Sequence, residues 1–314
     1  MIKKEEFTID SRDGKTALHA VKWLPEGQPI CILQIVHGMN EYILRYEEMA
    51  QYFAGKGILV VGDDHLGHGS SVPEGGQHGY ICESDGATVM VRDEHRLKKM
   101  MQQQYPGVPY LIFGHSMGSF ILRNYMMRYG SGIDGAILCG TGSPARWQLA
   151  MGKLLTATLS KLRGGRYVSR FVDKMTRKAY MSGIENPQTD HDWICTDPAV
   201  AKAFEQDPQS GGFTFSVNAY HVLFELADRM QDKKELAKIP KKLPVLIVSG
   251  TEDPVGEKGK APQRLYDDFL NLDMTKVTLK LYNGCRHELY NEPVKETFFL
   301  DLENWISLVL AERG

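Results

Sequence analysis

Gly114-His115-Ser116-Met117-Gly118 is a pentapeptide of the form G-x-S-x-G, and it lies between a short apolar run, 108–113, and a segment with apolar residues at helical spacing, 119–128. A strand-to-helix turn is the context expected of a nucleophile elbow. Because its two glycines have no side chain, the strand and the helix can approach each other closely, and the turn lifts the Ser116 hydroxyl toward the N-terminus of the helix. We predict that Ser116 is a nucleophile; an ordinary turn serine is the alternative.

The order of the predicted strands and helices indicates the fold class. Predicted strands alternate with helices across 30–140 and again across 243–312. This alternation is typical of an α/β protein with a mostly parallel central sheet and helices on both faces. The stretch 143–232 has helical patterns and no convincing strand. We therefore predict a core formed by 1–142 and 233–314, with 143–232 inserted as a helical cap.

Composition and charge narrow the class of protein. The chain has 314 residues, of which 42% are hydrophobic and 24% charged, and its formal net charge of −2 argues against a broadly basic nucleic-acid-binding protein. No apolar stretch is long enough to cross a bilayer, and the charged start, 1–6, lacks the apolar core of a signal peptide. The five cysteines are scattered and form no C-x-x-C pair, which favours reduced thiols and a cytoplasmic location.

A serine nucleophile needs a general base, and the base needs an orienting carboxylate. Asp253 follows the predicted strand 243–249, and His287 follows the predicted strand 277–282. Both loops fall at the carboxyl edge of the sheet, and the order Ser, Asp, His is the one found in folds with a nucleophile elbow. We predict that His287 is the base and Asp253 its partner. A capping aspartate and a surface-loop histidine are the alternatives, and Glu252 is the nearest competitor of Asp253.

Acyl transfer also requires two backbone N–H groups that stabilise the oxyanion. One should come from Met117, the residue after the serine, and the other from the loop after the strand 30–36. That loop reads His37-Gly38-Met39, so we predict an oxyanion hole made by Met39 and Met117. An ordinary turn at the end of the strand is the alternative.

The stretch Asp64-His65-Leu66-Gly67-His68-Gly69 has the composition of a metal site. Its glycines and its place after a strand favour a structural turn, and no third well-spaced ligand group is evident. We therefore expect no metal.

Several motifs resemble the monoacylglycerol lipase and lysophospholipase branch of the α/β-hydrolases, which belongs with the serine aminopeptidase S33-type hydrolases. They are His37-Gly38-Met39-Asn40-Glu41-Tyr42, Arg45-Tyr46, Asp64-His65-Leu66-Gly67-His68-Gly69-Ser70, Gly114-His115-Ser116-Met117-Gly118, Gly250-Thr251-Glu252-Asp253-Pro254 and Arg286-His287-Glu288. The resemblance covers 30–140 and 243–312 well and the cap loosely.

The resemblance implies an eight-stranded α/β-hydrolase core, the Ser116, Asp253 and His287 triad, the oxyanion hole of Met39 and Met117, and no cofactor. It also implies a serine carboxylic-ester hydrolase that acts through an acyl-enzyme on a small or lipid-like acyl ester, such as a monoacylglycerol or lysophospholipid. Met39 stands where the lipase often has a small residue, and its side chain would narrow the site.

Two other functions stay open. An amide or peptide hydrolase of the same fold, such as a proline-type aminopeptidase, would need an acidic group in the cap to bind a substrate amine, and 185–207 is rich in acids. A catalytically silent α/β-hydrolase acting as a binding protein is the other alternative, although such proteins usually lack a member of the triad.

The predicted cap has an uneven distribution of charge. Between 146 and 178 there are nine basic residues and a single acid, Asp173. This segment favours weak contact with an anionic membrane surface or an anionic substrate, and a solvated surface is the plainer alternative. One helical pattern, 151–162, carries Met151, Leu154, Leu155, Leu159 and Leu162, which should either line an acyl pocket or pack on the core.

Overall fold

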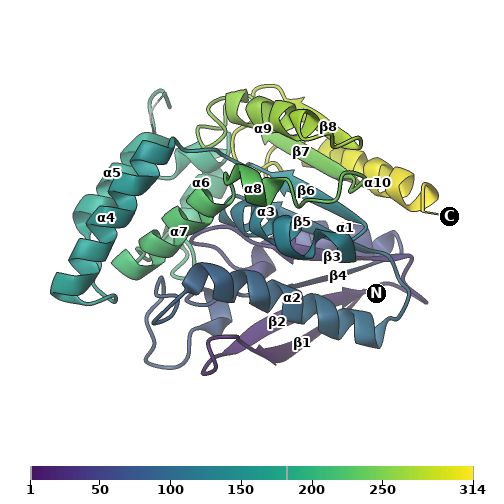
Figure 1. Cartoon of the computed structure of the whole chain (residues 1–314), viewed down its shortest axis with the longest axis horizontal. Helices are drawn as coiled ribbons and strands as arrows, with labels where there is room; N and C mark the ends of the chain where they lie inside the picture. Colours follow the sequence, from purple (N-terminus) through teal and green to yellow (C-terminus); the bar gives the residue numbers. More distant parts are fainter. Residues whose placement is uncertain (1, 182, 314) are drawn as a thin grey trace.

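An eight-stranded sheet forms the centre of the chain in the computed structural model, which describes residues 2–181 and 183–313 (Figure 1). The strands are β1 (Lys3–Asp10), β2 (Ala17–Leu24), β3 (Cys31–Val36), β4 (Ile58–Asp63), β5 (Tyr110–His115), β6 (Gly135–Cys139), β7 (Val245–Gly250) and β8 (Val277–Tyr282). Their order is β1-β2-β4-β3-β5-β6-β7-β8. β2 pairs antiparallel with both β1 and β4, and all the other pairs are parallel. The predicted mostly parallel sheet is confirmed.

Burial along the strands follows from their place in this sheet. The inner strands β3 to β7 are buried at every residue, which explains why their sequences are continuous apolar runs. The edge strands β1 and β8 alternate between exposed and partly buried residues. Leu111 of β5 belongs to the core on one face of the sheet, and its neighbour Ile112 to the core on the other face.

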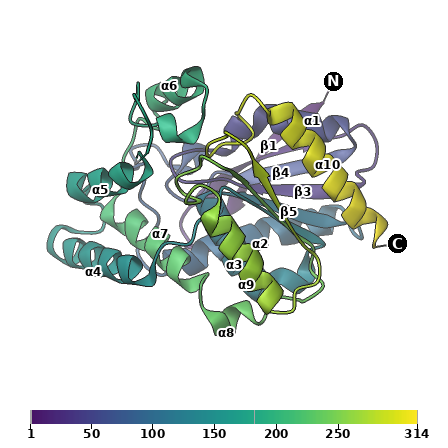
Figure 2. The ribbon, with the colours of Figure 1, turned by 90° about the horizontal axis from the view of Figure 1, so that it is seen from above.

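Helices cover both faces of the sheet (Figure 2). α1 (Glu47–Gly55) and α10 (Lys295–Ala311) lie on one face, while α2 (Gly86–Gln104), α3 (Met117–Tyr129) and α9 (Lys260–Asn271) lie on the other. These two layers enclose the two main hydrophobic clusters.

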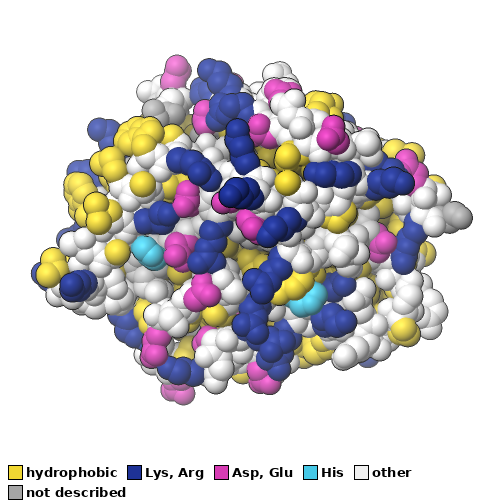
Figure 3. Space-filling view, viewed as in Figure 1, with side chains coloured by type: hydrophobic (Ala, Val, Ile, Leu, Met, Phe, Trp, Pro, Cys, Tyr) yellow, Lys and Arg dark blue, Asp and Glu magenta, His cyan; other side chains and the backbone are white. Residues whose placement is uncertain are grey.

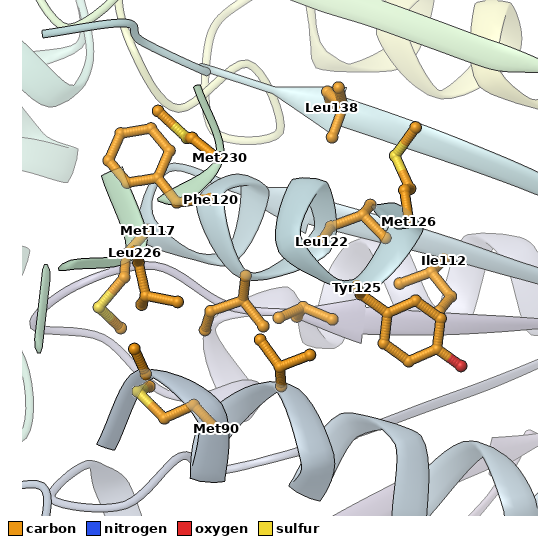
Figure 4. Packing of buried hydrophobic residues seen from close by; sticks show 14 of the residues in the cluster. Met90, Ile112, Met117, Phe120, Leu122, Tyr125, Met126, Leu138, Leu226 and Met230 are labelled. Carbon is orange, nitrogen blue, oxygen red and sulfur yellow. The ribbon is translucent and has the colours of Figure 1, made fainter. Parts of the chain in front are cut away.

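The cluster around α3 holds the elbow helix in place. Figure 4 shows Phe120 and Leu122 of α3 in one hydrophobic cluster with Ile112 and Leu138 of the sheet and Met90 of α2, which lie on different sides of the helix. All five side chains are at most 6% exposed. The helix that follows Ser116 is therefore fixed on several sides by close packing, which fixes the position of its N-terminus.

Between β6 and β7 the structure has helices and no strand among the described residues. We call residues 143–232 the cap segment; it contains α4 (Arg146–Arg163), α5 (Arg170–Tyr180), α6 (Pro198–Gln206) and α7 (Val217–Arg229), and α8 (Lys233–Leu236) follows it. In Figure 2 these helices lie beside the sheet, at one end of the molecule. α4 packs on α7, where a Cβ added at Gly152 would lie 2.7 Å from the Phe224 ring.

The predicted alternation of strands and helices across 243–312 implies a helix between β7 and β8, and α9 is that helix; Leu265 and Phe269 are its large buried side chains. One expectation about helices needs correction. The apolar residues of α4 were expected on one packed or pocket-lining face, but Met151, Leu154 and Leu162 are 63%, 71% and 73% exposed. The side of α4 that faces α7 is instead formed by smaller residues and by Leu155 and Leu159.

Candidate active site

Ser116 lies at the turn between β5 and α3, in a backbone conformation that few residues other than glycine adopt. Its φ is 52° and its ψ is −121°. Such a conformation costs about 1–3 kcal/mol and persists only where the surroundings hold it. Here the Ser116 N–H donates to the carbonyl of Cys139 at 2.9 Å, and the Ser116 carbonyl accepts from the Ser119 N–H at 2.9 Å. The predicted elbow geometry is therefore present.

The two motif glycines occupy positions with no room for a side chain. A Cβ at Gly114 would lie 2.6 Å from the carbonyl oxygen of Gly118, and one at Gly118 would lie 2.0 Å from that of Val36. The close approach of β5, α3 and β3 at this corner thus depends on both glycines.

Asp253 and His287 are brought together from the loops after β7 and β8. His287 Nδ1 lies 3.0 Å from both carboxylate oxygens of Asp253, and the two side chains are at most 2% exposed. The Asp253 carboxylate also accepts from the Val255 N–H at 2.9 Å. Glu252, the competing carboxylate, instead pairs with Lys258 at 2.9 Å on the surface.

The electrostatics of His287 are set by burial and by its partner. Burial alone would lower its pKa, but the charge of Asp253 and the hydrogen bond to it raise the pKa, and the net shift is upward from 6.5. Since a carboxylate accepts hydrogen bonds and Nδ1 faces it, Nδ1 carries the proton. The basic nitrogen of neutral His287 is therefore Nε2, which has no hydrogen-bond partner among the described residues.

Ser116 and His287 line one cavity, together with both residues of the predicted oxyanion hole, Met39 and Met117. The space is small, about 20 Å³, which is roughly room for a single water molecule. The geometry thus gathers the five predicted site residues, with Asp253 behind His287, around a nearly closed space.

The loop that carries Met39 is held by a buried carboxylate. Glu41 accepts a short hydrogen bond from the Gly38 N–H, and it also accepts from the hydroxyls of Tyr46 and Tyr290, each at 3.0 Å. A Cβ added at Gly38 would lie 2.5 Å from Glu41 Oε1 and 3.0 Å from Ser116 Cβ. The loop therefore lies directly against Ser116, and Glu41 holds it there through these hydrogen bonds.

Three aromatic residues of the cap segment cover the cavity. Tyr180, Trp193 and Phe204 line it with Ile194. The segment around Trp193 is tied to the loop of His287, because the Glu288 N–H donates to the Ile194 carbonyl at 2.7 Å. Arg286 adds hydrogen bonds to the carbonyls of Asp192 at 2.7 Å and Cys195 at 3.0 Å. Sequence reasoning did not find this cover, since nothing local in 180–204 indicates which aromatic residues turn inward.

Asp64 lies in the turn after β4 and stabilises the surrounding backbone, the structural role that the sequence analysis favours for this turn. Its carboxylate accepts from the backbone N–H groups of Ile43 and Ser70, each at 2.8 Å, and contacts His19 Nδ1 at 2.9 Å. A different group of polar side chains meets nearby, however: Asp63, His65 and Glu94 lie together in the interior. Glu94 was missed because it stands in the middle of α2, far from the other two in sequence.

Comparison with known proteins adds the family. The family model described as serine aminopeptidase, S33, matches residues 27–294. The chain belongs to this family. It is 28% identical over 287 residues to the monoacylglycerol lipase of Mycolicibacterium smegmatis, covering 90% of each chain. It is also 27% identical over 298 residues to human monoglyceride lipase, covering 93% of this chain and 87% of the human one.

Solved structures place this S33 family member among esterases and lipases. A thermostable carboxyl esterase from Bacillus coagulans, in complex with glycerol, superposes with a TM-score of 0.91 at 29% identity, covering 99% of this chain and 100% of that one. A lipase in an open form gives a TM-score of 0.89 at 25% identity, covering 98% and 99%. The predicted family and α/β-hydrolase fold are confirmed. Among residues 2–181 and 183–313, no helix has the length and apolar character needed to cross a bilayer.

Proposed function

We propose that this chain is a serine carboxylic-ester hydrolase that acts on monoacylglycerol-like esters, with Ser116, His287 and Asp253 as its triad. The observation that carries the proposal is a single cavity lined by Ser116 and His287. Ser116 has the strained backbone of an elbow, and His287 Nδ1 pairs with the buried carboxylate of Asp253. The lipases and the esterase named above support ester hydrolysis as the reaction class.

The chemistry follows from the orientation of His287. Ser116 Oγ attacks the ester carbonyl and gives its proton to His287 Nε2, which passes it to the leaving alcohol as the carbon–oxygen bond breaks. A water molecule then gives a proton to His287 and attacks the acyl-enzyme, and the proton returns to Ser116 as the carboxylic acid leaves. Asp253 keeps the proton on Nδ1 throughout and stabilises the imidazolium.

We assign the oxyanion hole to the N–H groups of Met39 and Met117. Met117 is the first residue of α3, so its N–H belongs to the first turn, which has no intrahelical acceptors. Met39 lies on the loop that packs against Ser116 Cβ. Two donors fixed before the reaction stabilise the developing negative charge without reorganisation.

The outer surface of the cap segment supports contact with a lipid surface. Trp147, Met151, Leu154, Leu162 and Phe171 are between 63% and 73% exposed on α4 and α5. Figure 3 shows apolar side chains gathered over these helices, with lysine and arginine among them. An apolar patch in a basic setting fits an anionic interface, from which a lipid-like ester would reach the site. The five described cysteines are all free and buried, which supports the proposed cytoplasmic location.

The structure does not favour the aminopeptidase alternative. Three of the acidic residues of 185–207 accept hydrogen bonds from nearby backbone groups. Asp197 caps the N-terminus of α6, Asp192 accepts from the Gln188 and Thr189 N–H groups, and Asp207 accepts from the Gln209 N–H. Glu41 and Glu288 do line the cavity, but both carboxylates bind Arg45. No carboxylate of the cap segment lines the cavity among the described residues, so the acidic group that this alternative expects in the cap is not found at the cavity wall.

The test is hydrolysis of monoacylglycerols from acetyl to oleoyl by the wild type, by Ser116→Ala, and by Ser307→Ala as a matched control on the exposed side of α10. Removal of the nucleophile should reduce kcat at least about 10³-fold, and the control should behave as the wild type. A fluorophosphonate should label the wild type and the control only. Unchanged hydrolysis by Ser116→Ala would overturn the assignment, and labelling without any ester hydrolysis would overturn the substrate class.

A further inference from the structure

Two buried histidines lie behind the loop that carries Met39. His37 directly precedes Gly38 and Met39, and His65 lies in the turn after β4; their side chains are 0% and 2% exposed. The two rings stack with their centroids 3.8 Å apart. Neither residue lines the cavity at Ser116, so any effect that they have on the reaction must pass through the loop.

The His37 ring has one defined tautomer. Burial and the charge of His65 hold the pKa of His37 well below 6.5, so the ring is neutral and only one of its nitrogens carries a proton. The His65 N–H donates to Nε2 at 3.0 Å, so the proton is on Nδ1. Nδ1 lies 2.8 Å from the carbonyl oxygen of Gly38, which can only accept, and this second contact requires the same tautomer.

This hydrogen bond fixes the peptide group that contains the Met39 N–H. The Gly38 carbonyl and the Met39 N–H belong to one peptide group, and no peptide bond is cis among the described residues. In a planar trans peptide the C=O and the N–H point in opposite directions, so His37 turns the Met39 N–H away from its own ring. The Met39 N–H has no acceptor within the described part of the chain, which leaves it available to a substrate oxygen.

His65 is charged, and two buried carboxylates stabilise the charge. His65 Nδ1 lies 3.1 Å from Glu94 Oε1 and 3.7 Å from Asp63 Oδ2. Burial lowers the pKa of His65, but hydrogen bonding to these carboxylates and their charges raise it, and the net result is a pKa of about 10. Both ring nitrogens therefore carry protons at neutral pH, and Nε2 donates to the carbonyl of His37 at 3.1 Å.

The peptide group between His37 and Gly38 is thus held at both ends. Its carbonyl oxygen accepts from the imidazolium of His65, and its N–H donates to the carboxylate of Glu41. Hydrogen bonds to charged partners are roughly twice as strong as neutral ones, so opposite charges at the two ends resist rotation of this peptide group. Side chains therefore fix both peptide groups that precede Met39.

We propose that His37, held by His65, is a positioning residue that points the Met39 N–H at the oxyanion. The inference rests on the proposed function and its oxyanion hole, because Met39 lines the cavity and a Cβ at Gly38 would lie 3.0 Å from Ser116 Cβ. A donor oriented before the substrate arrives stabilises the developing charge without reorganisation. Without the Nδ1 proton of His37, the 38–39 peptide group can rotate, so kcat should fall while KM changes little.

Asn and Gln at position 37 separate the roles of the two ring nitrogens. The Asn amide nitrogen can take the place of Nδ1 and keep the donor to Gly38, whereas the Gln amide reaches the place of Nε2 and leaves the Gly38 carbonyl without a donor. We expect His37→Gln to lower kcat about 10²–10³-fold, the usual cost of one oxyanion donor, with KM within about threefold of the wild type. His37→Asn should keep kcat within about tenfold of the wild type.

Rates are expressed per active site, counted by complete labelling with a fluorophosphonate, so a loss of folded protein does not enter. His68→Gln is the matched control, because His68 is 0% exposed beside His37 and its Nδ1 donates to the Leu66 carbonyl instead. The control should keep the wild-type kcat per site even if its Tm falls. The rate constant for fluorophosphonate labelling should fall with kcat in His37→Gln, since the phosphoryl oxygen needs the same donor. If the wild type is labelled but hydrolyses no ester, the proposed function fails and the labelling rates still test His37.

The tautomer can be measured in the wild type, without a variant and without activity. Nitrogen-15 spectra, with the histidine rings assigned through the backbone, should show a neutral His37 with its proton on Nδ1. A proton on Nε2 would overturn the proposal. So would equal losses in His37→Gln and His37→Asn, or a loss per site in His68→Gln as large as that in His37→Gln.

Discussion

The indole ring of Trp193 packs on the imidazole of His287, with the ring centroids 5.0 Å apart. Trp193 comes from the cap segment, 94 positions before His287 in the sequence. The hydrogen bonds from Arg286 to the carbonyls of Asp192 and Cys195 bind the loop of His287 to the segment that covers it. The loop of His287 and the segment that covers it are therefore held together, so we expect the side chains of both to affect which substrates bind.

Shortening Trp193 should change the preference for substrate size. Trp193→Ala removes a large ring from the cavity wall, so kcat/KM for oleoyl esters should rise several-fold relative to that for acetyl esters. Trp305→Ala is the control: Trp305 packs near Gly135 of β6, away from the cavity, and its loss should cost stability without changing the ratio. Equal ratios for both variants would remove Trp193 from the determinants of specificity.

Replacing Asp253 should slow the reaction and move its pH profile. Asp253→Asn should lower kcat by about 10³–10⁴-fold, because His287 loses the partner that fixes its tautomer. Without the carboxylate, burial dominates and the pKa of His287 falls, so the acidic limb of kcat/KM should shift to lower pH. Glu252→Gln, which alters only the exposed pair with Lys258, should leave rate and profile unchanged. A similar loss in both variants would contradict the assignment.

Activity and the stability contributed by His287 should depend on pH in opposite directions. Its pKa is raised in the folded state, since Asp253 outweighs burial, so its contribution to stability is fully present below pH 6.5 and is lost as pH rises through the folded pKa. Hydrolysis needs the neutral ring and should increase over the same window. Parallel measurements of kcat/KM and Tm test this, and His287→Gln should remove this part of the pH dependence of Tm.

A methyl group at Gly38 should disturb the oxyanion loop. In Gly38→Ala the new Cβ would meet Glu41 Oε1 at 2.5 Å and Ser116 Cβ at 3.0 Å, so the loop must shift and the Met39 N–H with it. We expect a fall in kcat of about 10²–10³-fold, the usual cost of losing one oxyanion donor, with a smaller change in KM. Gly55→Ala is the control, because a Cβ there has nothing within 4 Å. Normal kcat in Gly38→Ala would rule out Met39 as a donor.

The apolar surface of α4 should bind anionic vesicles. Leu154→Ser combined with Leu162→Ser should weaken sedimentation with phosphatidylserine-containing vesicles by about tenfold or more, since each leucine buries apolar area in the interface. Leu308→Ser is the matched control, because Leu308 is similarly exposed, at 65%, but lies on α10, far from the cap segment. Added salt should weaken the binding of the wild type to anionic vesicles more than its binding to neutral vesicles. Identical binding by all variants would exclude α4 from the contact.

The sequence was sufficient for the parts of the site whose geometry is set by local chemistry. Ser116 could be predicted because its turn needs glycine on both sides, Asp253 because it follows the buried strand β7, and His287 because it follows the next strand, β8. The parallel sheet then brings the three loops to one edge, and the structure has them there.

What the sequence could not predict depends on contacts between distant segments. Nothing near Trp193 indicates that its ring reaches His287, and nothing near Glu94 indicates that it meets His65. The exposed side of α4 was misread for a related reason: the apolar pattern identifies a helix, but Gly152 shows that α7 contacts a different side of it. Tertiary packing, rather than periodicity, decided these cases.

The cavity at Ser116 has a kinetic consequence. A space of about 20 Å³ holds roughly one water molecule, so an ester of glycerol can reach Ser116 only if the side chains that cover it move. If the opened form makes up about one molecule in a hundred, the apparent affinity for dissolved substrate is about a hundredfold weaker than the intrinsic one. An interface that favours the opened form would remove that penalty where substrate is concentrated.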